Sequence, residues 1–343
     1  MKQKYLILAD GKSPHTLKWI QELTHYFDVY LISLNGVPPQ MEKILKKESI
    51  FVLNESTNPS GKNYKLILTL FKIRNILHKL QPHYINAHYL SSYGFLAALA
   101  KSSVKNTILI QSLWGSDVLV EPFLNRLRYN IARYALNKAD YITADSFYVS
   151  DIVAKIVSSK ECIVFPFGFN KIEHYAGKKE KIVFSNRALK KSYCIDTVLR
   201  WFALQDSSYR LVISNDGPEK NNLFSLAKEL RIDERTTFVG YLSASEQQSY
   251  YQDSTYFISI PQSDATSVSL LEAMQFGTIP IVSNIPANRE WILDGINGHF
   301  FDPIKRLEEI QISKDFATIN QKILHEKALF PQSIERFIKR ISK

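Results

Sequence analysis

Short runs of β-branched and aromatic residues alternate with longer amphipathic stretches along the whole of this chain. Such alternation is typical of βαβ units, in which helices join parallel strands. In the first half we expect strands at residues 4–9, 28–34, 84–87, 106–113, 141–144 and 162–165, and helices at 16–25 and 66–80. In the second half we expect strands at residues 181–185, 210–214, 236–240, 256–260 and 279–282. The pattern therefore predicts the α/β class.

The pattern stops near residue 170 and then starts again, and 343 residues suit two ordinary domains. We predict two doubly wound, Rossmann-like domains over 1–170 and 181–330, a charged linker over 171–180 and a basic amphipathic helix over 331–343. Ligands of doubly wound sheets lie beyond the carboxyl ends of the strands. Two such domains facing each other predict a site in the cleft between them.

The net charge of +10 is concentrated in the first half of the chain. Residues 1–170 hold 20 Lys and Arg against 12 Asp and Glu, whereas residues 171–343 hold 23 against 21. This excess would attract nucleic acid, anionic lipid or a phosphorylated substrate, although a merely solvated surface gives the same composition. Nucleic acid is the weakest candidate, because the basic residues lack the interleaved aromatic side chains of a base-stacking platform.

Neither the apolar runs nor the cysteines indicate export. No window reaches the roughly 18 uninterrupted apolar residues that a membrane span requires. The apolar run at 5–9 ends at Asp10 and Lys12, so we expect a first strand there and not a signal peptide. Cys162 and Cys194 lack metal-ligand spacing and are expected to be reduced thiols. We therefore expect a cytoplasmic protein.

The segment richest in candidate binding groups follows a predicted strand and enters a helix. Thr266, Ser267 and Ser269 suit a helix N-terminus, where free amides and the helix dipole attract an anion such as a diphosphate. Glu272 lies about one turn inside and can accept hydrogen bonds from vicinal hydroxyls, while Asp264 precedes the helix. The alternative is an ordinary capped helix with an exposed glutamate.

With its neighbours, this segment resembles the family 4 glycosyltransferases, whose architecture is called GT-B. Their signature is two carboxylates separated by seven residues, followed by Ala-Met, Gly, a strand and an Asn-Gly turn. The matching residues here are Asp264, Glu272, Ala273-Met274, Gly277, the strand at 279–282, Glu290 and Asn297-Gly298. Further family motifs occur in order over nearly the whole chain: Ser13-Pro14-His15-Thr16, Asn86-Ala87-His88-Tyr89, Trp114-Gly115-Ser116-Asp117-Val118, Ala144-Asp145-Ser146, Pro166-Phe167-Gly168 and Asn215-Asp216-Gly217-Pro218.

The resemblance implies a nucleotide-sugar donor site in the second domain. Glu272 would hold the ribose hydroxyls, and Asp264 would contact the donor sugar. The other implied donor-binding residues are Arg187, Lys190, Lys191, Gly217, Tyr241, Leu242, Ser267, Val268 and Ser269. Arg187 and Lys190 would stabilise the diphosphate as it leaves. For Arg187 and the two lysines, the alternative is a solvated basic loop. For Tyr241 and Leu242, the alternative is that both are core residues at the end of a strand.

The resemblance also implies an acceptor site in the first domain. Its residues would be His15, at the start of the first helix, with His88, Trp114 and Asp117. The implied catalytic set is Asp264, Arg187, Lys190 and Asp117. Structural histidines and a helix-capping aspartate are the plainer alternatives.

Several departures from the family pattern bear on these contacts. Asp264 replaces the usual Glu, and Asn186 replaces the usual Gly before Arg187. The lysine of this loop is displaced from the commonest spacing, and Trp114 stands where relatives often have His. These departures leave undecided which residues contact the donor sugar. They do not remove the implied diphosphate site.

The resemblance implies a retaining transfer, and no glycosidase-like pair of flanking carboxylates is visible. The sequence contains no Asp-x-Asp, so we expect a metal-independent site in which Arg187, a lysine and a helix N-terminus replace the cation. It also lacks the Gly-x-Gly-x-x-Gly and Walker sequences of dehydrogenases and ATPases. We expect no cofactor other than the UDP- or GDP-linked donor, which is a substrate.

These observations predict a retaining hexosyltransferase that acts on a glycan or lipid-linked acceptor in surface polysaccharide or lipopolysaccharide biosynthesis. Two alternatives stay open: an epimerase or phosphorylase on the same scaffold, and a nucleotide-sugar-binding protein without transfer. We also expect peripheral contact with an anionic membrane at the cytoplasmic face, through Lys72, Arg74, Lys79 and the helix at 331–343.

Overall fold

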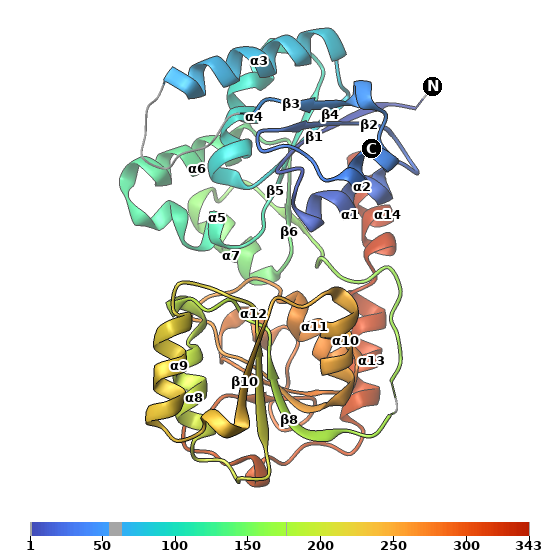
Figure 1. The fold of residues 1–343 in the computed structure, drawn as a ribbon. Coiled ribbons are helices and arrows are strands. Elements are labelled where there is room, and N and C mark those ends of the chain that lie inside the picture. Colours follow the sequence, from blue (N-terminus) through green and yellow to red (C-terminus); the bar gives the residue numbers. More distant parts are fainter. Residues whose placement is uncertain (1, 55–63, 176, 343) are drawn as a thin grey trace. The chain divides into compact units, whose positions relative to one another are not determined.

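A computed structural model describes residues 2–54, 64–175 and 177–342, without the side chains of residues 64–67. The chain forms two compact units, which are described separately (Figure 1). The first comprises Met1–Phe167 and Pro331–Lys343, and the second comprises Gly168–Phe330. None of the described helices is both long enough and apolar enough to span a bilayer.

The first unit is built on a seven-stranded parallel sheet in the order β3-β2-β1-β4-β5-β6-β7. Its strands are β1 Lys4–Leu8, β2 Asp28–Ser33, β3 Ile50–Val52, β4 Tyr84–His88, β5 Ile108–Ser112, β6 Tyr141–Ala144 and β7 Cys162–Val164. The inner strand β1 is buried from Tyr5 onward, which explains its uninterrupted apolar run. The strand order reverses between β1 and β4, the point at which doubly wound sheets usually bind ligands.

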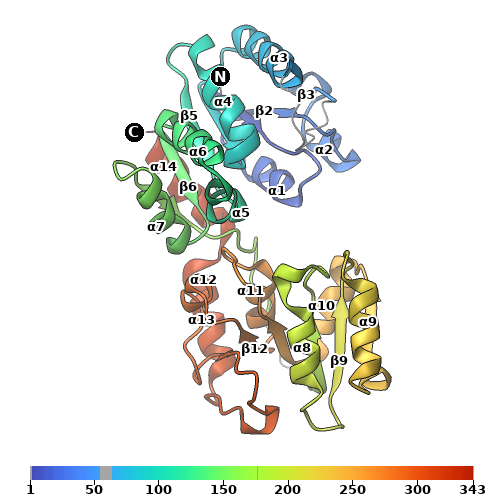
Figure 2. The same ribbon diagram turned by 90° about the vertical axis from the view of Figure 1, so that its left-hand side faces the viewer.

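Helices cover both faces of this sheet (Figure 2). They are α1 Pro14–Leu23, α2 Pro39–Ile44, α3 Tyr64–Leu80, α4 Phe95–Ala100, α5 Ser116–Leu119, α6 Arg126–Lys138, α7 Phe147–Ile156 and α14 Phe330–Ile341. Helix α14 buries Ile334, Phe337 and Ile341, and the Phe337 ring lies 5.7 Å from the ring of Trp19 in α1. The helix predicted at 331–343 is thus an integral part of the first unit.

The second unit holds a six-stranded parallel sheet in the order β10-β9-β8-β11-β12-β13. Its strands are β8 Glu180–Ser185, β9 Arg210–Ser214, β10 Thr236–Gly240, β11 Ser254–Ser259, β12 Ile279–Val282 and β13 His299–Phe300. Its helices are α8 Ile195–Phe202, α9 Lys220–Glu229, α10 Ala244–Asp253, α11 Val268–Gln275, α12 Pro286–Arg289 and α13 Phe316–Lys327. The strand order reverses between β8 and β11, so the loops that follow these two strands meet at a second switch point.

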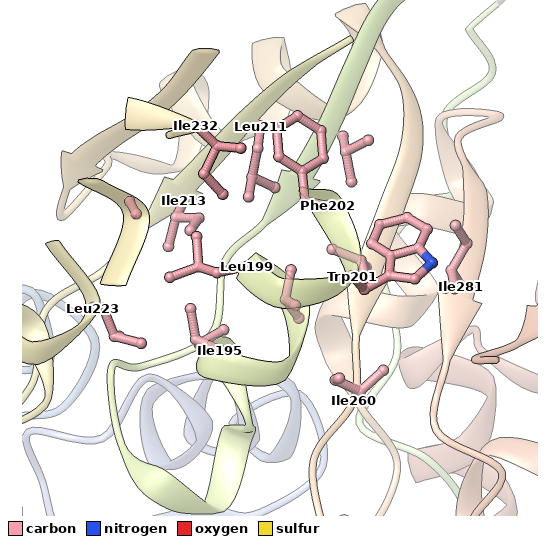
Figure 3. Close-up of a cluster of buried hydrophobic side chains, with 14 of the residues drawn as sticks. Ile195, Leu199, Trp201, Phe202, Leu211, Ile213, Leu223, Ile232, Ile260 and Ile281 are labelled. Carbon is pink, nitrogen blue, oxygen red and sulfur yellow. The ribbon is translucent and has the colours of Figure 1, made fainter. Parts of the chain in front are cut away.

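Helix α8 shows why this sequence folds as it does. Ile195, Leu199 and Phe202 recur at the spacing that places them on one helix face, and all three are buried. They pack into one cluster with Leu211 and Ile213 of β9 (Figure 3). This core fixes the loops between β8 and α8 and between β9 and α9.

Every strand predicted from the sequence is present, with bounds within two residues of those expected. The edge strands β3 and β13 were not predicted. They have three and two residues, and most of their side chains are only half-buried. A segment this short carries no readable alternation.

Candidate active site

An arginine at the switch point of the second unit joins residues that lie far apart in the sequence. Arg187 follows β8, and its Nε donates a hydrogen bond to Ser259 Oγ at 2.7 Å. Its Nη2 donates to Ser267 Oγ at 2.9 Å and forms an ion pair with the Asp264 carboxylate. The Arg187 side chain is only 12% exposed, and its guanidinium lies 5.2 Å from the centre of the Tyr193 ring. The guanidinium is therefore held rigidly at this turn.

The turn leads directly into the N-terminus of α11. Ser267 is the N-cap, and its hydroxyl accepts a hydrogen bond from the Leu270 amide at 3.3 Å. The amides of the first turn of a helix have no partner within the helix. Val268 and Ser269 supply these amides and are half-buried. The structure thus brings Arg187, Asp264 and this helix N-terminus together, as predicted.

Glu272 lies on α11 at the edge of this cluster. Its carboxylate accepts a hydrogen bond from Gln247 Nε2 of α10 at 2.9 Å. Tyr251, one turn further along α10, is fully buried, and its hydroxyl accepts a hydrogen bond from Asn186 Nδ2 at 2.9 Å. Burial, and after it the negative charge of Glu272, raises the pKa of the Tyr251 phenol. A neutral tyrosine therefore lies between the Asn186 loop and Glu272.

Gln247 and Tyr251 were not among the predicted site residues. They occur four positions apart on α10, so both side chains face the same direction. Nothing in the sequence, however, shows that this face of α10 meets α11 and the loop after β8. The usual glycine before Arg187 is Asn186 here, and this asparagine provides the link to Tyr251.

Lys190 and Lys191 are exposed and line a pocket of about 360 Å³ beside the N-terminal ends of α8 and α9. Arg187, Asp264 and Glu272 are absent from the residues that line it. The lining also includes Asp196, Glu219 and Gln262, so the pocket combines acidic and neutral groups with the two lysines. A contact between these lysines and a donor phosphate stays a prediction.

The remaining predicted donor residues lie in the loops after β9 and β10. The backbone of Leu189 lies so close to residue 217 that only glycine fits there, because a Cβ atom would lie 2.4 Å from the Leu189 carbonyl oxygen. Tyr241 is 77% exposed, whereas Leu242 is half-buried against the cluster that contains Tyr251. Their contact with a nucleobase stays a prediction.

In the first unit, three predicted acceptor residues form one aromatic cluster. The His15 and Trp114 rings are 4.6 Å apart, and the His88 and Trp114 rings are 5.4 Å apart. Burial lowers the pKa of His88 to about 3 and the pKa of His15 to about 4. Both ring nitrogens of His88 lack a hydrogen-bond partner among the described residues. Both imidazoles are therefore neutral near pH 7.

Asp117, the fourth predicted acceptor residue, is buried and accepts hydrogen bonds from backbone amides. The donors are the amides of Leu90 at 2.9 Å, Trp114 at 3.1 Å and Gly115 at 2.9 Å. Burial raises the pKa of this carboxyl above its usual value. Asp117 therefore ties the loop after β5 to the segment after β4. A direct contact between Asp117 and a substrate stays a prediction.

Both halves of the chain match known glycosyltransferase families. Residues 4–146 match the family described as "Glycosyl transferase 4-like", and residues 169–312 match the "Glycosyl transferases group 1". Two parallel sheets in this arrangement define the GT-B fold. Each half of the chain is therefore similar to a glycosyltransferase domain, the second half to those of group 1.

Three curated relatives show which proteins this chain is similar to. It is 24% identical over 247 residues to the N-acetyl-alpha-D-glucosaminyl L-malate synthase of Bacillus anthracis, covering 66% of this chain and 63% of that protein. It is 30% identical over 170 residues to the alpha-monoglucosyldiacylglycerol synthase of Streptococcus pneumoniae, covering 48% and 38%. It is 31% identical over 98 residues to the O-antigen biosynthesis glycosyltransferase WclY of Escherichia coli, covering 29% and 27%. The matches thus span less than two thirds of each relative.

Two solved structures share the fold over almost their entire length. The sucrose-phosphate synthase of Thermosynechococcus elongatus superposes with a TM-score of 0.80 at 13% identity, covering 99% of both chains. Anabaena HepE in complex with UDP and glucose superposes with a TM-score of 0.78 at 13% identity, covering 98% of this chain and 99% of that one. At this identity the likeness concerns the fold alone.

Proposed function

We propose that this chain transfers a sugar from a UDP- or GDP-linked donor to a glycan or lipid-linked acceptor, with retention of the anomeric configuration. The observation that carries the proposal is the fixed Arg187 guanidinium at the N-terminus of α11, beside Asp264 and Ser267. A helix N-terminus combined with a guanidinium is well suited to a diphosphate. HepE, which shares the fold, was solved with UDP and glucose, and this supports a nucleotide-sugar donor.

The chemistry assigned to this cluster is stabilisation of the leaving group. Negative charge develops on the donor diphosphate as the bond to the sugar breaks, and preorganised donors stabilise that charge. The contacts of Arg187 with described residues use Nε and Nη2, so Nη1 retains donors for a phosphate oxygen. We propose that this fixed positive charge supports transfer without a metal ion. Asp264 orients the guanidinium, and we assign it to a hydroxyl of the donor sugar.

Glu272 is assigned to the donor ribose. A carboxylate can accept about four hydrogen bonds, which suits it to vicinal hydroxyls, and Gln247 helps to orient it. In the first unit, the neutral His15–Trp114 cluster is assigned to the acceptor. The names of the relatives, which include a glycolipid synthase and an O-antigen enzyme, support a glycan or lipid-linked acceptor. An enzyme of this kind would act at the cytoplasmic face of a membrane in surface polysaccharide biosynthesis.

The proposal is tested with Arg187→Ala and Glu272→Ala. Each variant removes a charge-assisted contact of about 1.5–3 kcal/mol, so kcat/KM should fall by roughly ten- to a hundredfold. The exposed pair Arg210 and Glu180 provides matched controls in the same unit, and Arg210→Ala and Glu180→Ala should retain activity. Wild-type turnover by Arg187→Ala or Glu272→Ala would remove the assignment.

Two further measurements define the reaction. Thermal shift with UDP- and GDP-sugars identifies the base, because a ligand at 100 times its dissociation constant adds about 2.7 kcal/mol of stability. Turnover should require an acceptor and persist in EDTA. Product formed from donor alone would indicate an epimerase, and binding without turnover would indicate a nucleotide-sugar-binding protein.

A further inference from the structure

A run of large apolar side chains projects from the first unit just after the loop that Asp117 organises. Phe123 is 55% exposed, Leu124 is 59% exposed and Leu127 is 70% exposed. They belong to a short 3₁₀ helix, Glu121–Leu124, and to the first turn of α6. Exposed apolar side chains that occur singly are ordinary, but three within five residues form a patch.

The local structure holds this patch in place. Pro122 and Val118 are buried beneath it. The Asn125 side chain caps α6 by accepting a hydrogen bond from the Arg128 amide at 2.9 Å. The Phe123 ring lies 6.3 Å from the ring of Tyr129. The exposed side chains are thus presented by anchored backbone.

Helix α6 continues the patch as a stripe. Leu127 and Tyr134 are two turns apart on its exposed face, whereas Ala132 and Leu136 face inward and are buried. Helix α4 packs on α6 and also on α3, as the two ribbon views show (Figures 1 and 2). The α3 helix adds Leu68, 54% exposed, and Phe71, 61% exposed, to the same layer of helices.

The charged side chains of α6 beside the stripe are basic. Arg126 and Arg133 are exposed and occur two turns apart, next to Leu127 and Tyr134 in the sequence, and Lys138 lies one turn after Tyr134. The acidic partner within this segment is Glu121, which lies 3.8 Å from Arg128 with both side chains well exposed. Such a pair contributes little. The surface therefore keeps a positive charge around an apolar centre.

Of the other groups that we predicted to contact a membrane, Lys72 and Lys79 are exposed, whereas Arg74 and the basic residues of α14 are less suited to it. The Arg74 guanidinium, which we predicted to face phospholipid, is half-buried and donates to the Leu99 carbonyl at 2.9 Å. On α14, Lys339 is paired with Glu335, and Arg340 lies 3.5 Å from Glu161. The Arg74 guanidinium is directed toward protein, and α14 buries its apolar face, so neither helix presents these cations beside exposed apolar side chains.

We propose that Phe123, Leu124 and Leu127, flanked by Arg126 and Arg133, form a docking surface for an anionic lipid bilayer. The apolar side chains enter the boundary between headgroups and acyl chains, and the arginines contact lipid phosphates. The surface continues from the loop 114–117, so docking holds the candidate acceptor residues at the membrane. The role of docking in positioning the acceptor residues rests on the proposed transfer to a lipid-linked acceptor. Binding of the surface to a bilayer does not depend on that transfer.

Co-sedimentation of the full chain with vesicles tests the surface. Wild-type protein should bind vesicles of equal phosphatidylglycerol and phosphatidylcholine in 50 mM salt, and should bind pure phosphatidylcholine weakly. Each charge removed should lower the partition coefficient by about fivefold. Arg126→Gln/Arg133→Gln should therefore lose about 25-fold, and Leu124→Gln/Leu127→Gln should lose at least about tenfold.

Matched controls lie elsewhere on the chain. Leu293→Gln/Ile304→Gln removes two exposed apolar side chains of the second unit and should leave binding unchanged. Lys339→Gln/Arg340→Gln removes two charges from α14 and should have a smaller effect than the α6 pair. Thermal shift with the donor checks that each variant is folded and separates a failure of docking from a failure of the proposed transfer.

A second readout does not depend on loss of binding. The fluorescence of a Leu127→Trp variant should shift to shorter wavelength with anionic vesicles, because the indole leaves water. The proposal is overturned if wild-type protein does not bind anionic vesicles in low salt, if the α6 variants bind like wild type, or if the indole stays in water. Concentration-dependent dimerisation that the same variants abolish would instead assign the surface to a second copy.

Discussion

The buried His88 and the half-buried His15 of the first unit predict that acid destabilises this unit well before its carboxylates are protonated. Burial lowers the pKa of His88 to about 3, and burial together with the nearby Lys18 lowers the pKa of His15 to about 4. An unfolded histidine has a pKa of about 6.5. At pH 5 both histidines are therefore mostly protonated in the unfolded chain and mostly neutral in the folded chain. Stability is therefore highest above pH 6.5 and falls as the pH decreases toward the folded-state pKa values.

Because both folded-state pKa values lie below pH 5, the size of the loss at pH 5 follows from the distance of that pH below the unfolded-state pKa of about 6.5. Each pKa unit corresponds to about 1.4 kcal/mol, so each histidine removes about 2 kcal/mol between pH 7 and pH 5. The pair removes about 4 kcal/mol, which is a large part of the 5–15 kcal/mol that holds an ordinary domain together. The effect should be confined to the first unit, because both residues lie within it.

Urea unfolding followed by tryptophan fluorescence at pH 7 and pH 5 measures the loss. The His88→Phe variant replaces the imidazole with a nontitrating ring in an aromatic environment, and its pH-dependent loss should be about 2 kcal/mol smaller than that of wild type. His78→Phe, at an exposed position of α3, provides the matched control and should keep the wild-type loss. An unchanged loss in His88→Phe would refute the argument that a buried neutral imidazole limits acid stability.

Two further predictions concern the loops that shape the sites. Gly217→Ala should destabilise the second unit by about 1–3 kcal/mol, because the new Cβ would overlap the Leu189 carbonyl. The midpoint of thermal unfolding measures this loss. An unshifted midpoint would show that the loops after β8 and β9 can move apart without cost. In Asp117→Asn an NH₂ group replaces one of the two oxygens that accept hydrogen bonds from backbone amides, and this group cannot accept them. The free energy of unfolding should therefore fall by about 1–3 kcal/mol. Amide exchange over residues 88–92 should then rise, and unchanged exchange there would argue against the positioning role.

Much of the fold could be predicted because parallel strands are buried on both faces. Such strands appear in the sequence as apolar runs bounded by polar residues, and β1, β9 and β12 match this description. The same reasoning missed β3 and β13, because an edge strand of two or three half-exposed residues has no such run. The amphipathic pattern of α14 could be predicted from the sequence. That its apolar face packs on the first unit could not.

The candidate site shows the same division. Arg187, Asp264 and Ser267 could be predicted as neighbours, because each follows or caps an element at the carboxyl edge of one sheet. The contacts of Gln247 and Tyr251 depend on how α10 packs against α11, and local sequence does not encode that packing. The two lysines were expected beside Arg187 but line a pocket that Arg187 does not line.

The position of α14 makes the first unit discontinuous in the chain. Trp19 and Phe165 are covered by Phe337, which is synthesised more than 160 residues after β7. A ribosome will therefore have produced the whole second unit before the first can close its last apolar surface. Any shortened form that stops before Phe330 would leave that aromatic surface bare, and this predicts chaperone dependence and aggregation in a fragment whose sheet is otherwise complete.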